Sequence, residues 1–495
     1  MTSNSEEISR KLGKPHPNGP LVKTVCSNAW GVHPEIQCIN QLESYDDANF
    51  HLVAAISGTS DENTASCQKS AEYLLKFYNA VESNNVEMLE GISQLLRTVS
   101  SYPDVSECHS FNHPIVPVPI VTAVEFRARL ENFCSDTTKA DYLSESFGCE
   151  DNLKDVAFSK ICPRSDGTVN DRIAARLFHW IPGPTLNKAG EPTDATPMLV
   201  TNVGFALGSI SNSLRNFDHA AFHRYHSWDL QNFDSVAGTF LCYVEEPDIR
   251  ELVQLVLDCF CKQVLPLSHA FSKSVIMGDC NDANVIINSE KTAVVGIIDF
   301  GDAVYTWSIN EVAIALAYSM LTDYGRSEPL RSMSCLFGGF IYAVGKCCDR
   351  ADVTERLHPS SEGSECSITN ALPHLHTLIC VRLCVSIMIG AYSISKDPTN
   401  EYLKLHAHPA KEALRTMLRG AGTEIKPDDR EKVHSSIAHS ADTAPRHALD
   451  PTSLLCLFTK VSEETMALGT GPDGPAHEGP ALVSLLTRIA SEHRV

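Results

Sequence analysis

The stretch S-V-I-M-G-D-C-N-D-A-N-V-I-I-N-S-E-K-T-A-V-V-G-I-I-D-F-G-D, residues 274–302, decides the expected fold of this 495-residue chain. A short apolar strand leads into a polar loop, and two apolar runs, 285–288 and 294–298, follow on either side of a Ser-Glu-Lys-Thr turn. Short apolar runs joined by a polar turn are typical of a β-hairpin. In an antiparallel hairpin, the residue before the first strand lies near the residue after the second. We therefore expect Asn284 and Asp299 to lie side by side.

Asp279 lies on the loop that enters this hairpin, so three oxygen-bearing side chains are expected at one mouth. Mg²⁺ takes hard oxygen ligands and usually only one or two carboxylates, with phosphates and waters completing its shell. Phosphoryl transfer uses an Asp–Asn pair on the metal and another Asp that faces the acceptor hydroxyl. The order Asp279, Asn284, Asp299, with Phe-Gly following, has the spacing of that template. We predict that Asp279 is catalytic and that Asn284 and Asp299 bind Mg²⁺; the alternative is a polar turn cluster without chemistry.

The N-terminal part of the chain offers groups that would bind a nucleotide. Lys76 lies on a predicted strand at 71–77, and Glu90 lies on an amphipathic helix predicted at 86–99. A strand lysine paired with a helix glutamate positions nucleotide phosphates in kinases. Glu87, one helical turn away, is a rival partner for Lys76.

The polar turn at 44–49 lies where a kinase places its phosphate-covering loop. It lacks glycine, so backbone amides and Asn49 would have to cover the phosphates. The phosphate-binding motifs G-x-x-x-x-G-K-[ST] and G-x-G-x-x-G are both absent from the sequence.

Predicted strands precede predicted helices along the chain, which favours an α+β fold. We expect a two-lobed, protein-kinase-like fold with a small β-rich N-lobe and a larger, mainly helical C-lobe. The expected N-lobe covers 36–180, with an inserted segment at about 104–160, and the C-lobe covers 181–425. Residues 1–35 are expected to form a loose leader, and 426–495 a polar linker with a short helical tail.

Composition excludes some classes of partner. Lys and Arg total 40 against 61 Asp and Glu, so the formal net charge is −21. Proteins that bind nucleic acid or anionic membranes usually carry a basic face, so we expect neither partner. The N-terminus shows no apolar signal-peptide core, and no apolar run approaches the ~20 residues of a membrane span. The 18 cysteines are therefore expected to be reduced thiols in the cytoplasm.

The motif G-D-C-N-D-A-N-V-I-I at 278–287, followed by G-I-I-D-F-G-D, resembles the aminoglycoside phosphotransferase / choline kinase superfamily, whose usual form is H-G-D-x-x-x-x-N. The resemblance implies a Mg²⁺-dependent kinase that uses GTP, with ATP as the other possible donor, to phosphorylate 5-hydroxy-L-lysine in lysine catabolism. It also implies that Arg176 and His179 lie on a strand beside the guanine. The other segments that carry the resemblance are S-Y-D-D-A-N-F (44–50), E-Y-L-L-K (72–76), A-R-L-F-H-W-I-P-G (175–183), E-V-A-I-A (311–315) and R-L-C-V-S-I-M-I-G-A-Y-S (382–393).

A dibasic amino-acid acceptor should meet carboxylates near its ammonium groups and a cation near its carboxylate. Asp282, Asp302 and Glu311 lie near the predicted mouth, although Glu311 could simply favour a helix N-terminus. Arg382 could bind the acceptor carboxylate or could extend from an apolar helix toward solvent. Met277 stands where the superfamily usually has a histidine that supports the catalytic loop.

Two alternative functions stay open at this point. One is a kinase for another small amino alcohol, such as homoserine, choline or an aminoglycoside. The other is a catalytically weakened protein that binds nucleotide without turnover. The spacing of His219, His223 and His226 could suggest a metal site, but we expect surface or capping roles for these side chains. The sequence leaves the oligomeric state undetermined.

Overall fold

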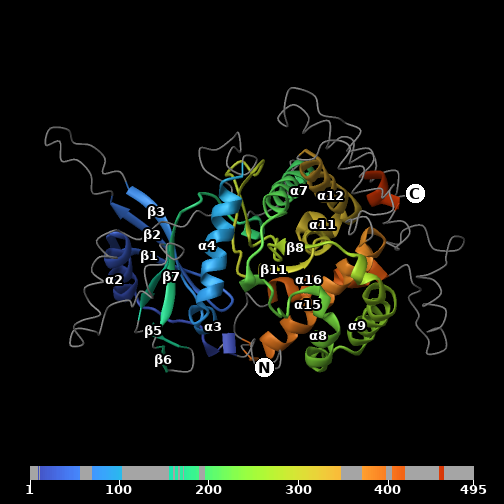
Figure 1. Ribbon diagram of the computed structural model, residues 1–495, viewed down its shortest axis with the longest axis horizontal. Coiled ribbons are helices and arrows are strands. Elements are labelled where there is room, and N and C mark those ends of the chain that lie inside the picture. The colour runs from blue at the N-terminus through green and yellow to red at the C-terminus, as the bar shows by residue number, and fades with distance from the viewer. Residues whose placement is uncertain are drawn as a thin grey trace, which may run out of the picture. The chain divides into compact units, whose positions relative to one another are not determined.

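The protein is described by a computed structural model, and its described residues form two compact units (Figure 1). The first unit holds the described residues up to 101, 155–181 and 219–221, and the second holds the rest. Most of the expected insertion at 104–160 and of the expected tail at 426–495 lies outside the described residues. These are 9–10, 12–55, 70–102, 155–159, 162–164, 168–170, 172–188, 196–346, 371–396, 398, 404–418 and 456–461.

The first unit is built on a five-stranded antiparallel sheet in the order β1-β2-β3-β7-β4. The strand predicted at 71–77 and the helix predicted at 86–99 are confirmed as β3 and α4. The strands are β1 (Pro34–Leu42), β2 (Ala48–Ala55), β3 (Ser70–Phe77), β4 (Ala157–Ser159) and β7 (Ile173–His179), with a small separate pair, β5 (Cys162–Pro163) and β6 (Val169–Asn170). The helices are α2 (Gly19–Trp30), α3 (Ala80–Ser83) and α4 (Val86–Ser100).

Alternate residues of β7 face opposite sides of this sheet, as the pleat of a strand requires. Ile173, Ala175 and Leu177 belong to the core that includes α2, whereas Ala174 packs with Leu89 of α4. Figure 1 shows the two helices on opposite sides of the sheet. Both faces of β7 are therefore buried.

The expectation of a loose leader at 1–35 is wrong, because α2 lies inside this range. Asn18 caps the helix by accepting a hydrogen bond from Leu21 N, and Gly31 ends it in a left-handed conformation with φ 67°. Val22, Cys26 and Trp30 are buried in the core of the sheet. Their spacing of four residues is a helical signal that the sequence already carried.

The second unit is mainly helical and contains the decisive hairpin. The predicted hairpin is confirmed: β9 and β10 pair antiparallel, with Val285 opposite Ile297. A second pair, β8 and β11, encloses it in the sequence. The strands are β8 (Lys273–Ile276), β9 (Val285–Ile287), β10 (Val294–Ile297) and β11 (Val304–Trp307). The helices are α7 (Thr196–Ser213), α8 (Phe233–Phe240), α9 (Pro247–Cys259), α10 (Ile309–Ser319), α11 (Asp323–Ser327), α12 (Pro329–Lys346), α15 (Leu375–Lys396) and α16 (Lys404–Leu418).

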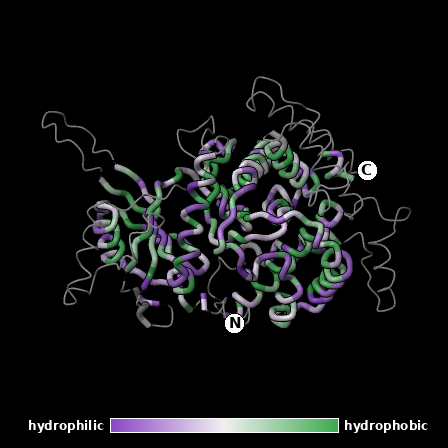
Figure 2. Tube along the Cα trace, in the orientation of Figure 1, coloured by the Kyte–Doolittle hydropathy of each residue, from purple (hydrophilic) through white to green (hydrophobic). Residues whose placement is uncertain are grey.

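The helix α15 is long and largely apolar; Figure 2 colours the chain by hydropathy in the orientation of Figure 1. By length and composition alone, the segment Leu372–Lys396 could cross a membrane, but 78% of its apolar window is buried within the fold. The helix packs against α10, α16, α8 and α9. Its apolar character is therefore that of a core helix, and its one buried arginine is part of the site described next.

Candidate active site

Asp279 lies on the loop between β8 and β9. Polar side chains of this loop fix the shape of the loop. Asn281 Oδ1 accepts hydrogen bonds from Ala283 N (2.8 Å) and Asn284 N (3.1 Å). Gly278 has φ 79°, and a Cβ there would lie 3.0 Å from the carbonyl oxygen of Asp302. Only glycine adopts this conformation without strain, so the G-D spacing is required by the turn itself.

Asp279 and Asn284 are in direct contact at the mouth of the hairpin. Asn284 Nδ2 donates to Asp279 Oδ2 and to the Asp279 carbonyl, both at 2.9 Å. Asn281 Nδ2 donates to the same carboxylate oxygen at 2.8 Å. Since Asn284 uses its amide nitrogen in both bonds, its Oδ1 is the atom that can act as an acceptor or a cation ligand.

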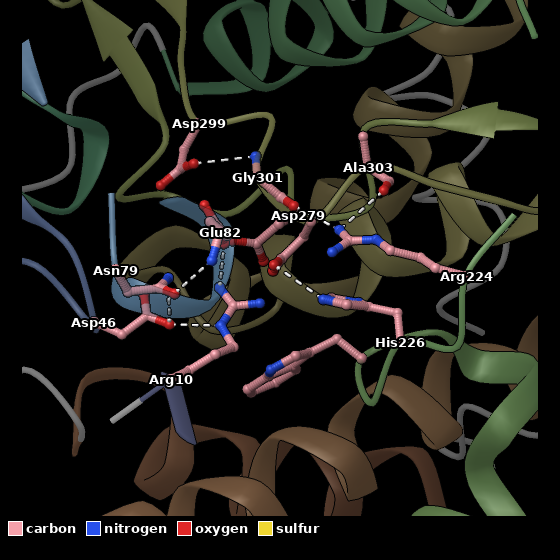
Figure 3. Close-up of polar contacts among 12 residues, drawn as sticks. Arg10, Asp46, Asn79, Glu82, Arg224, His226, Asp279, Asp299, Gly301 and Ala303 are labelled. Carbon is pink, nitrogen blue, oxygen red and sulfur yellow. Dashed lines mark hydrogen bonds and ion pairs between the residues drawn. The ribbon is translucent and has the colours of Figure 1, made fainter. Parts of the chain in front are cut away.

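Asp299 lies one residue beyond the last backbone bond of the hairpin, in which Ile298 N donates to Asn284 O at 2.9 Å. It has φ 64°, the left-handed region, and its exposed carboxylate accepts a bond from Gly301 N at 3.2 Å (Figure 3). Because Ile298 N is bonded to Asn284 O, Asp299 lies at the same mouth of the hairpin as Asn284, whose side chain contacts Asp279. The predicted gathering of Asp279, Asn284 and Asp299 is thus present in the structure.

The oxygen atoms at this mouth fit a magnesium ion. One exposed carboxylate and one amide oxygen, on Asp299 and Asn284, are the small set of hard donors that Mg²⁺ accepts when phosphates and waters complete its shell. Within the described part of the chain, no group of three or more His, Cys, Asp or Glu side chains is arranged to hold a metal. A site built wholly from protein ligands is therefore not found among those residues.

Arg382 of α15 holds the carboxylate of Asp279. It is 1% exposed, and its Nη2 donates to Asp279 Oδ1 at 2.8 Å and to Tyr318 Oη at 2.9 Å. Its Nη1 donates to the carbonyl of Trp228 at 3.1 Å. The prediction that Arg382 binds the acceptor carboxylate is wrong, and so is the solvent-directed alternative, because the guanidinium is enclosed.

Burial raises the pKa of Asp279 to about 7, against the opposing effect of Arg382. The carboxylates of Asp302 and Asp299 act in the same direction as burial. An acid with a pKa near neutrality is suited to exchange a proton with a hydroxyl group. The environment of Asp279 therefore agrees with the role that its position in the motif predicts.

Glu311, in the first turn of α10, is also a support of the loop. It is 1% exposed, and its carboxylate accepts hydrogen bonds from Met277 N (2.7 Å) and Gly278 N (3.2 Å). Burial raises its pKa to about 7, while these two bonds oppose the rise. The prediction that Glu311 meets the cationic acceptor is wrong, since no part of the carboxylate reaches solvent. It anchors the loop at the position where Met277 cannot donate a side-chain hydrogen bond.

Two side chains hold the segment after Asp299: Arg224, which the sequence did not single out, and His226, for which a different role was expected. Arg224 Nη2 donates to the carbonyls of Gly301 (2.7 Å) and Ala303 (3.1 Å), as Figure 3 shows. His226 is 3% exposed, and its Nε2 lies 3.4 Å from Asp302 Oδ1. The expected surface or capping role is wrong for His226.

The other two histidines of that spacing behave as expected. His219 Nδ1 accepts a bond from Ala221 N at 3.2 Å, and His223 is exposed, 2.7 Å from Asp218. Of the remaining acceptor candidates, Asp302 is held by His226, and Asp282 is half-buried with its carbonyl bonded to Asn187 N at 3.1 Å. Contact of Asp282 and Asp302 with an acceptor stays a prediction.

In the first unit, Asn49 and Lys76 are direct cross-strand partners on β2 and β3. Lys76 Nζ lies 2.9 Å from Asp47 Oδ2, and the Oδ1 of Asn49 is buried without a hydrogen-bond partner. Glu90 accepts a hydrogen bond from Gln94 at 3.1 Å. The Lys76–Glu90 clamp stays a prediction. The buried Glu82 is a further carboxylate near the lysine: burial raises its pKa to about 7, and Lys76 opposes the rise.

The side chain of Arg176 is enclosed within the first unit. Its side chain is 0% exposed and lies beneath α4, where it donates to Asp155, Tyr78, Ser93 and the Leu89 carbonyl. The prediction of a cofactor contact by Arg176 is therefore wrong; the residue fastens α4 to β7. His179, at the end of the same strand, is exposed and stays a candidate.

Sequence comparisons agree with this geometry. Residues 156–331 match the model of the phosphotransferase enzyme family. The matched range contains the ordered Asp279, Asn284 and Asp299, so this part of the chain is similar to phosphotransferases.

Curated relatives cover most of the chain. Hydroxylysine kinase from Bos taurus is 23% identical over 455 residues, which is 88% of this chain and 100% of the bovine protein. The Xenopus laevis hydroxylysine kinase is 23% identical over 84% of this chain and 94% of its own length. Among solved structures, the amicoumacin kinase hAmiN in complex with AMP-PNP, Ca²⁺ and Ami overlaps with a TM-score of 0.47 at 13% identity, covering 83% of this chain and 95% of that one.

Proposed function

We propose that this chain is a hydroxylysine kinase, which transfers the γ-phosphoryl group of GTP to the hydroxyl of 5-hydroxy-L-lysine and releases GDP and 5-phosphohydroxy-L-lysine. The observation that carries the proposal is the contact of Asp279 with Asn284 at the hairpin mouth, with Arg382 holding the other carboxylate oxygen. The similarity to hydroxylysine kinases over most of the chain supports the choice of acceptor.

Each group at the mouth has a task in this reaction. Asp279 orients the acceptor hydroxyl and receives its proton, and Glu311 and Arg382 keep its loop and its carboxylate in place. Asn284 and Asp299 would hold Mg²⁺, which neutralises charge on the phosphates when bound. Lys76 would bind nucleotide phosphates. Asp282 and Asp302 are the carboxylates proposed to attract the ammonium groups of the acceptor.

The choice of GTP over ATP comes from the family resemblance, and His179 is the exposed residue on β7 proposed to lie beside the base. Cytoplasmic location and a step in lysine catabolism belong to the same proposal. The net charge of −21 supports a small cationic acceptor, since a negative protein field attracts cations.

A coupled GDP-release assay with a panel of hydroxylated amines tests the proposal. We expect turnover with 5-hydroxylysine that is abolished by Asp279→Asn and retained by Asp258→Asn, a control carboxylate on the outer part of α9. Turnover only with homoserine, choline or an aminoglycoside would show that the chain is a kinase for that acceptor and not for 5-hydroxylysine. Nucleotide binding without any turnover would instead support a catalytically weakened protein.

A further inference from the structure

A buried cluster of charges lies at the end of the sheet in the first unit. We call it the N-lobe charge cluster: Arg10, Asp46, Asp47, Lys76 and Glu82. Arg10 Nε lies 2.6 Å from Asp46 Oδ2, and its Nη2 lies 3.1 Å from Glu82 Oε1. Lys76 pairs with Asp47 at 2.9 Å. Figure 3 shows Arg10 reaching both Asp46 and Glu82. The cluster thus joins the predicted phosphate-binding lysine to a residue from the N-terminal segment.

The N-terminal segment is tied to the predicted phosphate-covering turn by its backbone and by a second cation. Lys14 Nζ donates to the carbonyls of Ser44 (2.7 Å) and Tyr45 (3.3 Å). Ala80 N, at the start of α3, donates to the carbonyl of Gly13 at 3.0 Å. These contacts place Arg10 and Lys14 over the same turn and α3.

The turn has further partners besides the N-terminal segment. Asn79 N donates to Asp47 Oδ1 at 2.8 Å, and Asn79 Nδ2 lies 3.3 Å from the same oxygen. Ser44 Oγ donates to the Asp47 carbonyl. A glycine-rich loop can close over phosphates by changing its backbone angles. This glycine-free turn is instead held by several side-chain and backbone partners, so its side chains have defined positions without a nucleotide.

The charges of the cluster depend on one another. It contains three carboxylates and two cations, and all five side chains are largely buried. Burial raises the pKa of Glu82 to about 7; Asp47 and Asp46 add to the rise, whereas Arg10 and Lys76 oppose it. Without the guanidinium, Lys76 would be the remaining cation beside three acids. Its ammonium would then be drawn toward them and away from a phosphate.

We propose that Arg10 is a positioning residue of the nucleotide site, which occupies Asp46 and Glu82 so that the ammonium of Lys76 can bind nucleotide phosphate. The inference rests on the proposed function, because it assumes that Lys76 binds the nucleotide of a kinase reaction. It gives the N-terminal segment a role in nucleotide affinity that the sequence pattern did not suggest.

The test is a fluorescence titration of the full chain with Mg·mant-GTP. Arg10→Met should raise the dissociation constant about tenfold, as expected for loss of a charge-assisted interaction, with the KM for 5-hydroxylysine unchanged. Arg10→Met combined with Glu82→Gln removes one charge of each sign, and it should restore affinity to within about threefold of the unmodified chain. Lys23→Met is the matched control, since Lys23 makes only an exposed, 3.9 Å pair with Glu35 in the same segment.

Two results would overturn the positioning role while the kinase proposal stands: mant-GTP affinity unaffected by Arg10→Met, or equal weakening in the single and double variants. Arg10→Lys covers the case in which Arg10→Met does not fold: a lysine keeps the charge but cannot reach Asp46 and Glu82 together, so mant-GTP affinity should fall by less than tenfold, and an unchanged affinity would contradict the proposal. A folded, unmodified chain that binds no nucleotide would end the proposed function and this inference together.

Discussion

Glu311→Gln is the substitution whose consequences follow most directly from the geometry. The carboxylate accepts two backbone hydrogen bonds, from Met277 and Gly278. A glutamine side chain has one oxygen and one NH₂ group. One of the two backbone N–H groups would therefore face the NH₂ group, which cannot accept its hydrogen bond. A hydrogen bond to a charged group contributes about 1.5–3 kcal/mol. Loss of one should cost the catalytic loop about 2 kcal/mol, equivalent to a roughly 30-fold fall in kcat if the full cost is felt in the transition state.

The same substitution should change the pH dependence of stability. Burial raises the pKa of Glu311 from its ordinary value of 4.5 to about 7. Between these values the folded chain keeps a proton that the unfolded chain has lost. The free energy of unfolding therefore falls as pH rises through this window, by up to about 1.4 kcal/mol per pH unit for this group. Asp279 and Glu82, whose pKa values are also raised to about 7, contribute with the same sign.

Urea unfolding without added metal, at about pH 5 and about pH 7, measures this dependence. Glu311→Gln should lose roughly 2 kcal/mol of the difference between the two conditions, because the two pH values span most, but not all, of the window between the unfolded and folded pKa values of Glu311. Glu251→Gln, an exposed carboxylate on α9, is the control and should leave the difference unchanged. The reasoning is refuted if Glu311→Gln keeps both the wild-type pH dependence and the wild-type kcat.

Two further predictions follow from the burial of the site. Arg382→Lys keeps the charge but cannot reach Asp279, Tyr318 and the Trp228 carbonyl together; we expect kcat to fall at least about tenfold in steady-state assays with nucleotide KM unchanged. Equal kinetics would contradict the positioning role. Cys280 is buried, and burial raises the pKa of its thiol. Iodoacetamide mapped by mass spectrometry should label the exposed Cys242 in the folded chain and Cys280 only in urea; prompt labelling of Cys280 would show an open loop.

The hairpin and its motif could be predicted because their signals are local. The turn, the flanking apolar runs and the five-residue step from Asp279 to Asn284 lie within one short stretch, and antiparallel pairing then fixes where Asp299 comes. The fold class followed from the order of strands and helices. Local pattern was thus sufficient for the part of the site that consecutive residues build.

The supporting residues could not be assigned in this way because their partners are distant in sequence. Arg382 is 103 positions from Asp279 in the sequence. Glu311 is 34 and 33 positions from Met277 and Gly278, whose backbone N–H groups donate to its carboxylate. The sequence pattern around an arginine on an apolar helix is the same whether the side chain binds a ligand or a buried carboxylate. Arg176 posed a similar problem, because β7 is buried on both faces and alternation does not indicate which face a nucleotide would approach.

The left-handed backbone of Asp299 bears on how an inactive form of this protein should be made. An alanine at φ 64° would pay a steric cost of roughly 1–2 kcal/mol that glycine avoids and asparagine largely tolerates. An Asp299→Ala variant would therefore combine loss of the carboxylate with local misfolding. If it were inactive, the two effects could not be separated. Asparagine keeps the shape of the bend while deleting the charge, which makes it the cleaner choice for trapping a bound complex.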